Sequence, residues 1–176
     1  MPDTLSKLGC EGMWDDFRAA LERVLLNYEE RVMLVISDQE RESLLVQFFG
    51  LDEGRGQDCV VAQLGFRDTG DVFSSELVSQ LEQLGFEEQY EYGERWLWQR
   101  DLPWPTPSKA IAETVQACLL RLRDIGGMSG PERLQYRAWR YPEPPGPSGS
   151  FEGLDPGEDS VAFPSLGIAQ QPRETW

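Results

Sequence analysis

Residues 31–66 read RVMLVISDQERESLLVQFFGLDEGRGQDCVVAQLGF, and the fold class follows from their pattern. Three runs within it, 31–38, 42–50 and 58–66, are rich in β-branched and aromatic residues, which favours strands. The links SDQER and GLDEGRGQ are short and contain turn formers, so the three strands are expected to form an antiparallel meander. The second link is interpreted as a hairpin turn, because it lacks the lysine and threonine of a nucleotide-binding loop.

These predicted strands carry apolar side chains on both faces. Successive residues of a strand point to opposite faces, so Leu45, Gln47 and Phe49 share one face and their alternate neighbours share the other. A sheet with one face in water alternates apolar and polar residues, so a second face this apolar requires a cover. Either the helices of the same chain cover it, or part of it meets a second subunit or a bound peptide.

On both sides of this stretch the apolar residues recur with a helical period. A first amphipathic helix is expected over 12–27. A second is expected over 74–85, with Ser74 as its cap and Gly85 as its stop. This shorter helix is a candidate cover for part of the second sheet face.

The strongest helical pattern follows at 104–127, with Thr106 as the expected cap and two glycines at its end. SGPERLQYRAW (129–139) is predicted to restart as a short helix behind its proline. Between the second and third helices, FEEQYEY (86–92) and RWLWQRD (95–101) are predicted to pair as a hairpin.

The predicted order is helix, three strands, helix, two strands, helix, which is typical of an α+β domain on one antiparallel sheet of about five strands. We expect an N-terminal arm at 1–10, the α+β domain at 11–140 and an acidic, Pro- and Gly-rich tail at 141–176. Prolines remove donors and fix φ, so the tail is expected to be extended and mostly disordered. Its apolar islands, SVAFPSLGI (160–168) and Trp176, either dock on the domain or a partner or stay idle, and the idle tail is favoured.

Composition excludes several classes of function. The 31 acidic and 16 basic residues give a formal net charge of -15, which repels phosphate backbones and argues against nucleic-acid binding. The same charge favours neutral or basic polypeptide partners. The sequence has no histidine, so the commonest general base and zinc ligand are both missing, and no cofactor or metal is expected. Carboxylate pairs arise by chance among so many acids, so an enzyme that uses carboxylates alone is the least favoured hypothesis.

The cysteines and the apolar runs bear on location. Three cysteines without a CxxC spacing are typical of reduced thiols in a cytosolic protein. The longest unbroken apolar run, VMLVI, is far below the ~18 residues that a membrane span requires. The sequence therefore predicts a cytoplasmic protein that does not enter a membrane.

Aromatic residues concentrate in RWLWQRDLPWP (95–105). Alternation places Trp96 and Trp98 on one strand face, and an aromatic strand near a sheet edge suits the addition of an extended segment. Trp104, between two prolines, is expected to close the end of the sheet. The candidate peptide-binding residues are those expected opposite the long helices, with the two strand tryptophans as second choices: Met33, Val35, Leu45, Gln47, Phe49, Trp96 and Trp98.

Several strings, taken in order, resemble a known group of domains: MWDDFRAALERVL, LLVQFFG, LVSQLEQLGF, RWLWQRDLPWP and RLRDIGGMSGPERLQYRAW. They are similar to the actinobacterial TY-Chap branch of the YbjN-like proteins, which are related to type III secretion chaperones of the Tir-chaperone class. The resemblance covers about residues 10–140, and Phe86 stands where the pattern usually has tryptophan. It implies a non-enzymatic, peptide-binding domain, commonly dimeric, that holds unfolded segments of secreted proteins along apolar grooves.

Two hypotheses of function follow. The leading one is a cytosolic chaperone or adaptor that holds an extended segment of a client, such as a secreted protein, on an apolar sheet face, with a homodimer as one expected assembly. The alternative is an immunity or inhibitor protein that binds a folded toxin through an acidic and aromatic surface.

Overall fold

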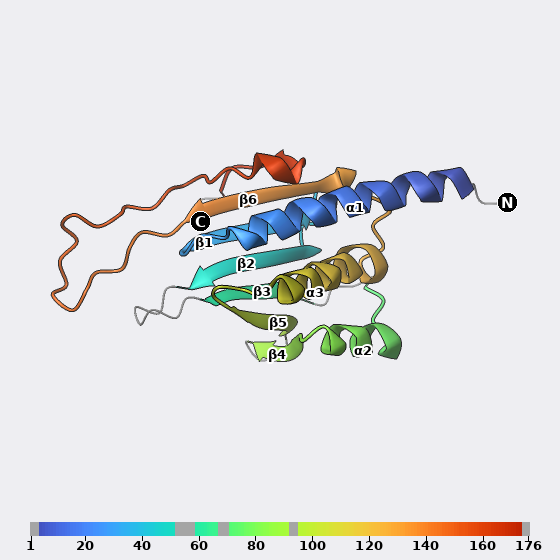
Figure 1. The fold of residues 1–176 in the computed structure, drawn as a ribbon, viewed down its shortest axis with the longest axis horizontal. Helices are drawn as coiled ribbons and strands as arrows, with labels where there is room; N and C mark the ends of the chain where they lie inside the picture. The colour runs from blue at the N-terminus through green and yellow to red at the C-terminus, as the bar shows by residue number, and fades with distance from the viewer. Residues whose placement is uncertain (1–3, 52–58, 67–70, 92–94, 174–176) are drawn as a thin grey trace.

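The meander predicted for residues 31–66 forms the centre of the sheet in the computed structural model, which describes residues 4–51, 59–66, 71–91 and 95–173 (Figure 1). Strand β1 (Val32–Asp38) pairs antiparallel with β2 (Leu45–Leu51), and β2 pairs antiparallel with β3 (Cys59–Phe66). The predicted meander is therefore confirmed. The glycine-rich link interpreted as a hairpin turn falls on residues 52–58, outside the described residues.

The predicted hairpin extends the meander on one side. Strand β4 (Glu87–Glu91) pairs antiparallel with β5 (Arg95–Pro103), and β5 pairs with the outer edge of β3. The full order is β4-β5-β3-β2-β1-β6-β7 in one sheet of 7 strands. The α+β class is confirmed, and the sheet is larger than the expected five strands because both additional strands lie beyond β1.

Strand β6 (Leu134–Arg140) occupies the position where a short helix was predicted, and that prediction is wrong. Pro131 begins a single 3-10 turn, η2 (Pro131–Arg133), after which the chain extends along the free edge of β1. The segment LQYRAWR alternates buried Leu134, Tyr136 and Ala138 with polar or large residues, which is the period of a strand. Strand β7 (Ala169–Gln170) then pairs parallel with β6.

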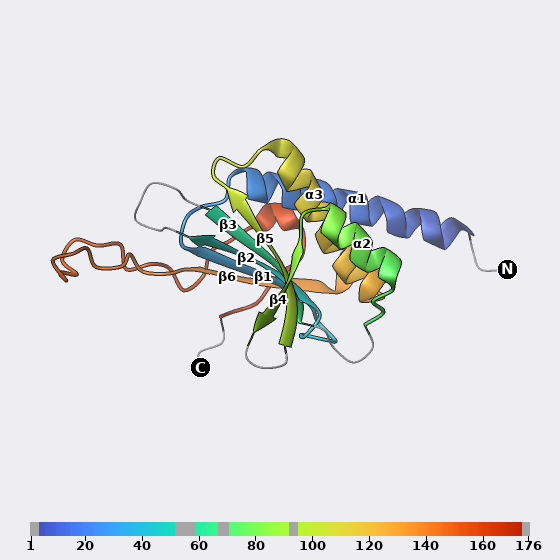
Figure 2. The same ribbon diagram turned by 90° about the horizontal axis from the view of Figure 1, so that it is seen from below.

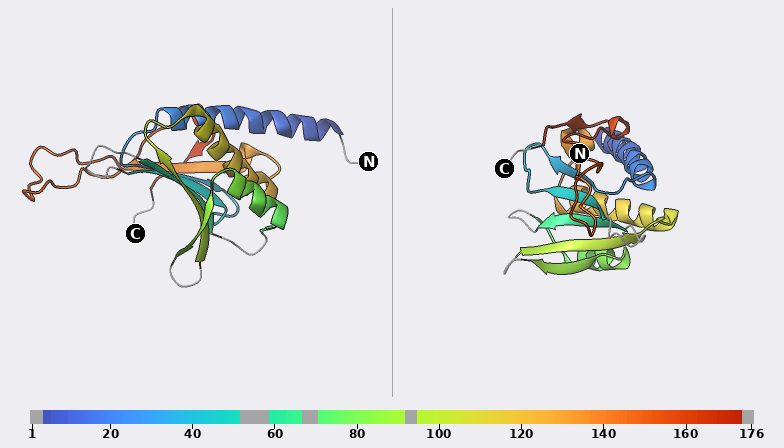
Figure 3. Two further views of the ribbon diagram at one scale, coloured as in Figure 1. Left: turned by 60° about the horizontal axis from the view of Figure 1, so that its bottom comes forward. Right: turned by 90° about the vertical axis from the view of Figure 1, so that its left-hand side faces the viewer.

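All three α-helices lie on one side of the sheet (Figures 2 and 3). They are α1 (Thr4–Leu26), α2 (Ser75–Gln83) and α3 (Ser108–Leu119), which continues as a π-helical segment, η1 (Leu120–Ile125). The expectation that the helix at 74–85 covers part of the second face is wrong, because α2 packs against η1 and buries Leu81 in the same core.

The two predicted helix caps have different outcomes. Ser74 caps α2, since its side chain accepts a hydrogen bond from the Leu77 N–H at 3.2 Å. Thr106 does not cap α3, because its hydroxyl donates to the Pro103 carbonyl at 2.7 Å and Pro107 takes the N-cap position. Pro103 and Pro105 thus end β5 in a turn before the helix begins.

One apolar core lies between the helices and the sheet. Helix α1 contributes residues such as Trp14, Phe17 and Leu21, and the sheet contributes Leu34 and Phe48, which are completely buried. Within the described ranges, none of the helices combines the length and apolar character needed to span a membrane.

A buried ion pair lies beside this core. The Arg121 side chain on η1 is 0% exposed and the Asp71 side chain is 1% exposed. The guanidinium donates to both carboxylate oxygens, at 3.1 and 2.8 Å, and its Nε donates to the Leu64 carbonyl of β3 at 2.9 Å. Arg41 adds a second contact to the same carboxylate at 3.0 Å. The pair ties the third helix to β3 and to the segment that leads into α2.

The chain after β6 leaves the sheet and returns to it. Residues 144–153 are exposed and extend far from the domain, as Figure 1 shows. The returning residues 158–171 lie along the outer edge of β6 and include β7 and a 3-10 turn, η3 (Pro164–Leu166). The expectation of a mostly disordered tail therefore does not describe residues 158–171, because their apolar side chains find buried positions: Leu166 is only 4% exposed.

Candidate functional site

The side of the sheet opposite the helices carries an apolar surface, which we call the open face. It comprises Met33 and Val35 of β1, Leu45, Gln47 and Phe49 of β2, and Val61 and Gln63 of β3. Each of these residues is half-buried, whereas the residues that alternate with them are buried under the helices. None of the residues that the structure describes forms a helix on this side (Figure 3). The sheet is therefore apolar on both faces and covered by helices on only one.

Strand register aligns the apolar members of the open face in one row. Met33 pairs with Phe49, and Phe49 pairs with Val61 on the next strand. On the other side, Met33 pairs with Trp139 of β6. Residues paired across strands lie about 4.5–5.5 Å apart at Cβ, so this row is a continuous apolar strip across four strands.

A row of amides runs beside the apolar strip. Gln47 Nε2 donates to Gln63 Oε1, Gln63 Nε2 donates to Gln99 Oε1 at 2.9 Å, and Gln99 Nε2 donates to Asp101 Oδ1 at 3.0 Å. Each primary amide has two donor hydrogens and an acceptor with two lone pairs. The row can therefore hydrogen-bond a polypeptide backbone placed over it while its own chain of bonds is kept.

Two residues from the C-terminal part of the chain close one end of the apolar strip. The Tyr141 ring meets Phe49 edge-on, with centroids 5.6 Å apart, and packs in the same manner against Trp139. The Arg173 guanidinium lies over Trp139 at 4.8 Å and over Tyr141 at 5.6 Å. These contacts leave the strip accessible toward β3 and cover it at β6.

The structure brings together five of the seven predicted binding residues and separates Trp98 from them. Met33, Val35, Leu45, Gln47 and Phe49 all lie on the open face. Trp98 does not, because it belongs to the core and is only 2% exposed.

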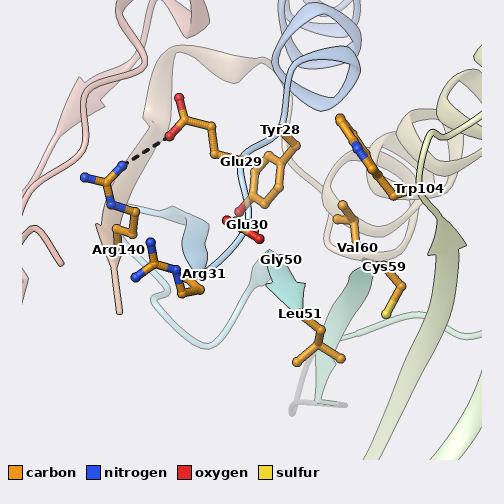
Figure 4. Close-up of a pocket in the computed structure, with 10 residues that line it drawn as sticks. All are labelled: Tyr28, Glu29, Glu30, Arg31, Gly50, Leu51, Cys59, Val60, Trp104 and Arg140. Carbon is orange, nitrogen blue, oxygen red and sulfur yellow. Dashed lines mark hydrogen bonds and ion pairs between the residues drawn. The ribbon is translucent and has the colours of Figure 1, made fainter. Parts of the chain in front are cut away.

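The remaining tryptophans of that stretch have different positions. The Trp96 backbone pairs with Tyr90 in the hairpin, and its side chain lies outside the described residues. Trp104 is 39% exposed, so the expectation that it closes the end of the sheet is wrong. It stands instead at the rim of a pocket of about 390 Å³ (Figure 4).

That pocket lies at the end of β2 and β3, beside the turn from α1 to β1. Glu29 and Arg31 of the turn line one side, and Cys59 and Val60 line the other. The turn approaches β2 closely, because a Cβ on Gly50 would lie 2.5 Å from the Glu29 carbonyl oxygen. Sequence reasoning missed this pocket, since its residues come from segments with no shared motif.

The described residues contain no group of three or more His, Cys, Asp or Glu side chains that could hold a metal ion. Cys118 is a free thiol, and burial raises its pKa well above the ordinary range. Cys118 is therefore held in the neutral form inside the core. The third cysteine, Cys10, has a side chain outside the described residues.

Comparison with known protein families gives a match over most of the chain. A family model described as T3SS (YopN, CesT) and YbjN peptide-binding chaperone 3 matches residues 9–140, which run from α1 to the last residue of β6. No curated protein and no solved structure matches the chain. The matched region contains the helical layer, the open face and the sheet as far as β6, and it accounts for most of the sequence. The chain therefore belongs to the TY-Chap3 family of peptide-binding chaperones.

Proposed function

We propose that this protein is a non-enzymatic chaperone or adaptor that holds an extended segment of a client polypeptide on the open face. The observation that carries the proposal is the strip formed by Met33, Phe49 and Val61, which is apolar, continuous across strands and free of a helical cover. Large apolar surfaces that remain accessible mark sites of interaction. The family description, which names peptide binding, supports the same function.

The chemistry of the face indicates which segments it would hold. The strip takes apolar side chains, and the neighbouring amides take the backbone of the same segment. The net charge of -15 attracts clients whose flanking residues are neutral or basic and repels acidic ones. A free thiol at the buried Cys118 suits a reducing compartment, so we place this activity in the cytosol.

A charge placed on the open face tests the proposal. Phe49→Asp and Val35→Asp are expected to weaken binding of fluorescein-labelled extended peptides, with apolar residues at alternate positions, by about tenfold or more. The physical reason is that a bound segment would have to bury an unpaired carboxylate. Fluorescence anisotropy measures the affinity. Ala112→Asp, on an exposed position of α3, is the matched control and is expected to bind as the wild type does.

Circular dichroism and cooperative thermal unfolding of each variant show whether the domain stays folded. Unchanged peptide affinity in a folded Phe49→Asp protein would contradict the proposal. Native mass spectrometry separates the competing occupants: a stable dimer that Phe49→Asp dissociates would assign the face to a second copy. Binding of a folded partner, without binding of any extended peptide, would favour the inhibitor hypothesis.

A further inference from the structure

The returning part of the tail, residues 158–171, hydrogen-bonds along the free edge of β6. The Arg140 N–H donates to the Glu158 carbonyl at 2.8 Å, and the Glu158 N–H donates back at 2.9 Å. The Val161 N–H donates to the Ala138 carbonyl at 2.9 Å, and the Gln171 N–H donates to the Tyr136 carbonyl at 2.7 Å. The tail thus meets the β6 edge twice, first through an antiparallel bridge at Glu158 and then as the short parallel strand β7, so it occupies edge groups that an added peptide could pair with.

Side chains of the tail enter the helical side of the molecule between α1 and β6, at a site we call the tail groove. The Phe163 ring stacks on Tyr28, with the planes at 2° and the centroids 6.4 Å apart, and it meets Tyr136 at 6.3 Å. The Phe163 N–H donates to the Tyr136 hydroxyl at 2.9 Å. Leu166 is 4% exposed and belongs to the core cluster. An aromatic residue and a leucine three residues later therefore anchor the segment.

Charged contacts hold the approach to the groove. Asp155 pairs with Arg31 at 2.8 Å and with Arg140 at 3.4 Å, and Arg140 also contacts Glu158. A hydrogen bond from the Gly157 N–H, followed by one from Arg31, lowers the pKa of Asp155 below its ordinary value. These groups are partly exposed, so they orient the tail more than they fix it.

The tail does not fill the groove. A hollow of about 510 Å³ remains between α1 and η3, lined by residues such as Phe17 and Ala20 of the helix and Leu166 and Ile168 of the tail. Met13 is 41% exposed at its rim. The hollow is open to solvent, so the groove continues beyond the side chains that the tail places in it.

The family match covers the edge of β6 but not the tail segment that occupies the groove. The match ends at residue 140, the last residue of β6, whereas residues 158–171 lie outside it. The edge of β6, Tyr28 and Tyr136 belong to the family domain, and the segment that covers them does not. The residues of the β6 edge that form the groove thus lie inside the matched region, and the segment that occupies it lies outside.

We propose that the tail groove is a second polypeptide-binding site, that residues 158–171 occupy it in cis, and that an extended segment of a client exchanges with them. The segment it fits has an aromatic residue at the position of Phe163 and an aliphatic residue three positions later, as Leu166 is. This site uses the helical side and the β6 edge, so its lining residues differ from those of the open face.

Tethering determines how the exchange is observed. A flexible tether holds the tail at an effective concentration in the millimolar range. For an untethered segment with a Kd of about 10 μM, the closed state is then about 100 times more populated than the open one. A peptide added in trans must overcome that ratio, so the intact chain conceals its own site.

The test uses the full chain and a fluorescein-labelled peptide with the sequence of residues 158–173, EDSVAFPSLGIAQQPR. We expect Phe163→Ser combined with Leu166→Ser, which weakens the tail in cis, to bind this peptide about 100-fold more tightly than the wild type. A peptide with the same two substitutions is expected not to bind. Phe151→Ser is the matched control, because Phe151 is 72% exposed in the tail and away from the groove.

Phe163→Ser alone is the milder variant for use if the double variant unfolds, and a smaller gain in peptide affinity is expected for it. No gain in affinity in a folded variant would overturn the proposal, as would tight binding by the wild type. A wild-type dimer that exchanges tails, seen by native mass spectrometry, would overturn occupancy in cis. Val35→Asp is expected to leave the affinity for the tail peptide unchanged, so the two proposals can fail separately.

Discussion

Asp71→Ala is expected to lower the free energy of unfolding by about 3–5 kcal/mol, because a buried guanidinium would lose the carboxylate that accepts two of its hydrogen bonds. The guanidinium that remains belongs to Arg121, whose side chain is 0% exposed. Domains are stable by only about 5–15 kcal/mol, so this loss removes a large part of the total. Urea denaturation followed by circular dichroism measures it.

The surface pair Arg123–Asp124 provides the control for this prediction. Both residues lie on the same π-helical segment, and Arg123 Nη2 is 3.0 Å from Asp124 Oδ2. Both side chains are about one-third exposed. Asp124→Ala is expected to change the free energy of unfolding by about 0–1 kcal/mol, the usual range for exposed ion pairs. Equal effects of the two substitutions would mean that burial of Asp71 does not determine its contribution.

Phe48→Ala is expected to lower the free energy of unfolding by about 3–5 kcal/mol, the range for truncating a buried phenylalanine. Phe48 is 0% exposed beneath the helices, and the cavity left behind would lie in the centre of the core. Its neighbour Phe49 lies on the open face and is only half-buried. Phe49→Ala is therefore expected to cost less than half as much.

The same two substitutions separate stability from binding. Phe49→Ala is expected to weaken binding of extended apolar peptides, whereas Phe48→Ala is expected to affect binding only as far as it unfolds the domain. Thermal unfolding and fluorescence anisotropy on both variants check this. A larger loss of stability for Phe49→Ala than for Phe48→Ala would mean that Phe49, and not Phe48, lies in the core.

The central strands were predictable because their signals are local. Runs of β-branched residues with short links identify β1, β2 and β3, and the same residues suffice for the antiparallel order. Strand β6 was missed because Pro131 suggested a helix start, while the alternation from Leu134 to Ala138 was short. Residues 134–140 form a strand and not a helix because they pair with the free edge of β1. That edge exists only in the folded domain, so local sequence patterns do not reveal it.

The faces of the strands were less predictable than the strands themselves. When both faces are apolar, periodicity cannot say which lies under the helices. Trp98 shows the limit, because its size suggested a binding role and its register placed it in the core. The pairing of Phe163 with Tyr28 could not be foreseen either, since these residues are far apart in the sequence and no local pattern links them.

The exposed excursion at 144–153 is the only covalent link, within the described chain, between β6 and the segment that lies on its edge. Extended, solvent-accessible backbone of this kind is where proteases act most readily. A single cut there would leave every noncovalent contact in place and yet convert a tethered strand into a separate, diffusible peptide. Dilution alone would then empty the groove, so a nick in this linker would act as a one-way release.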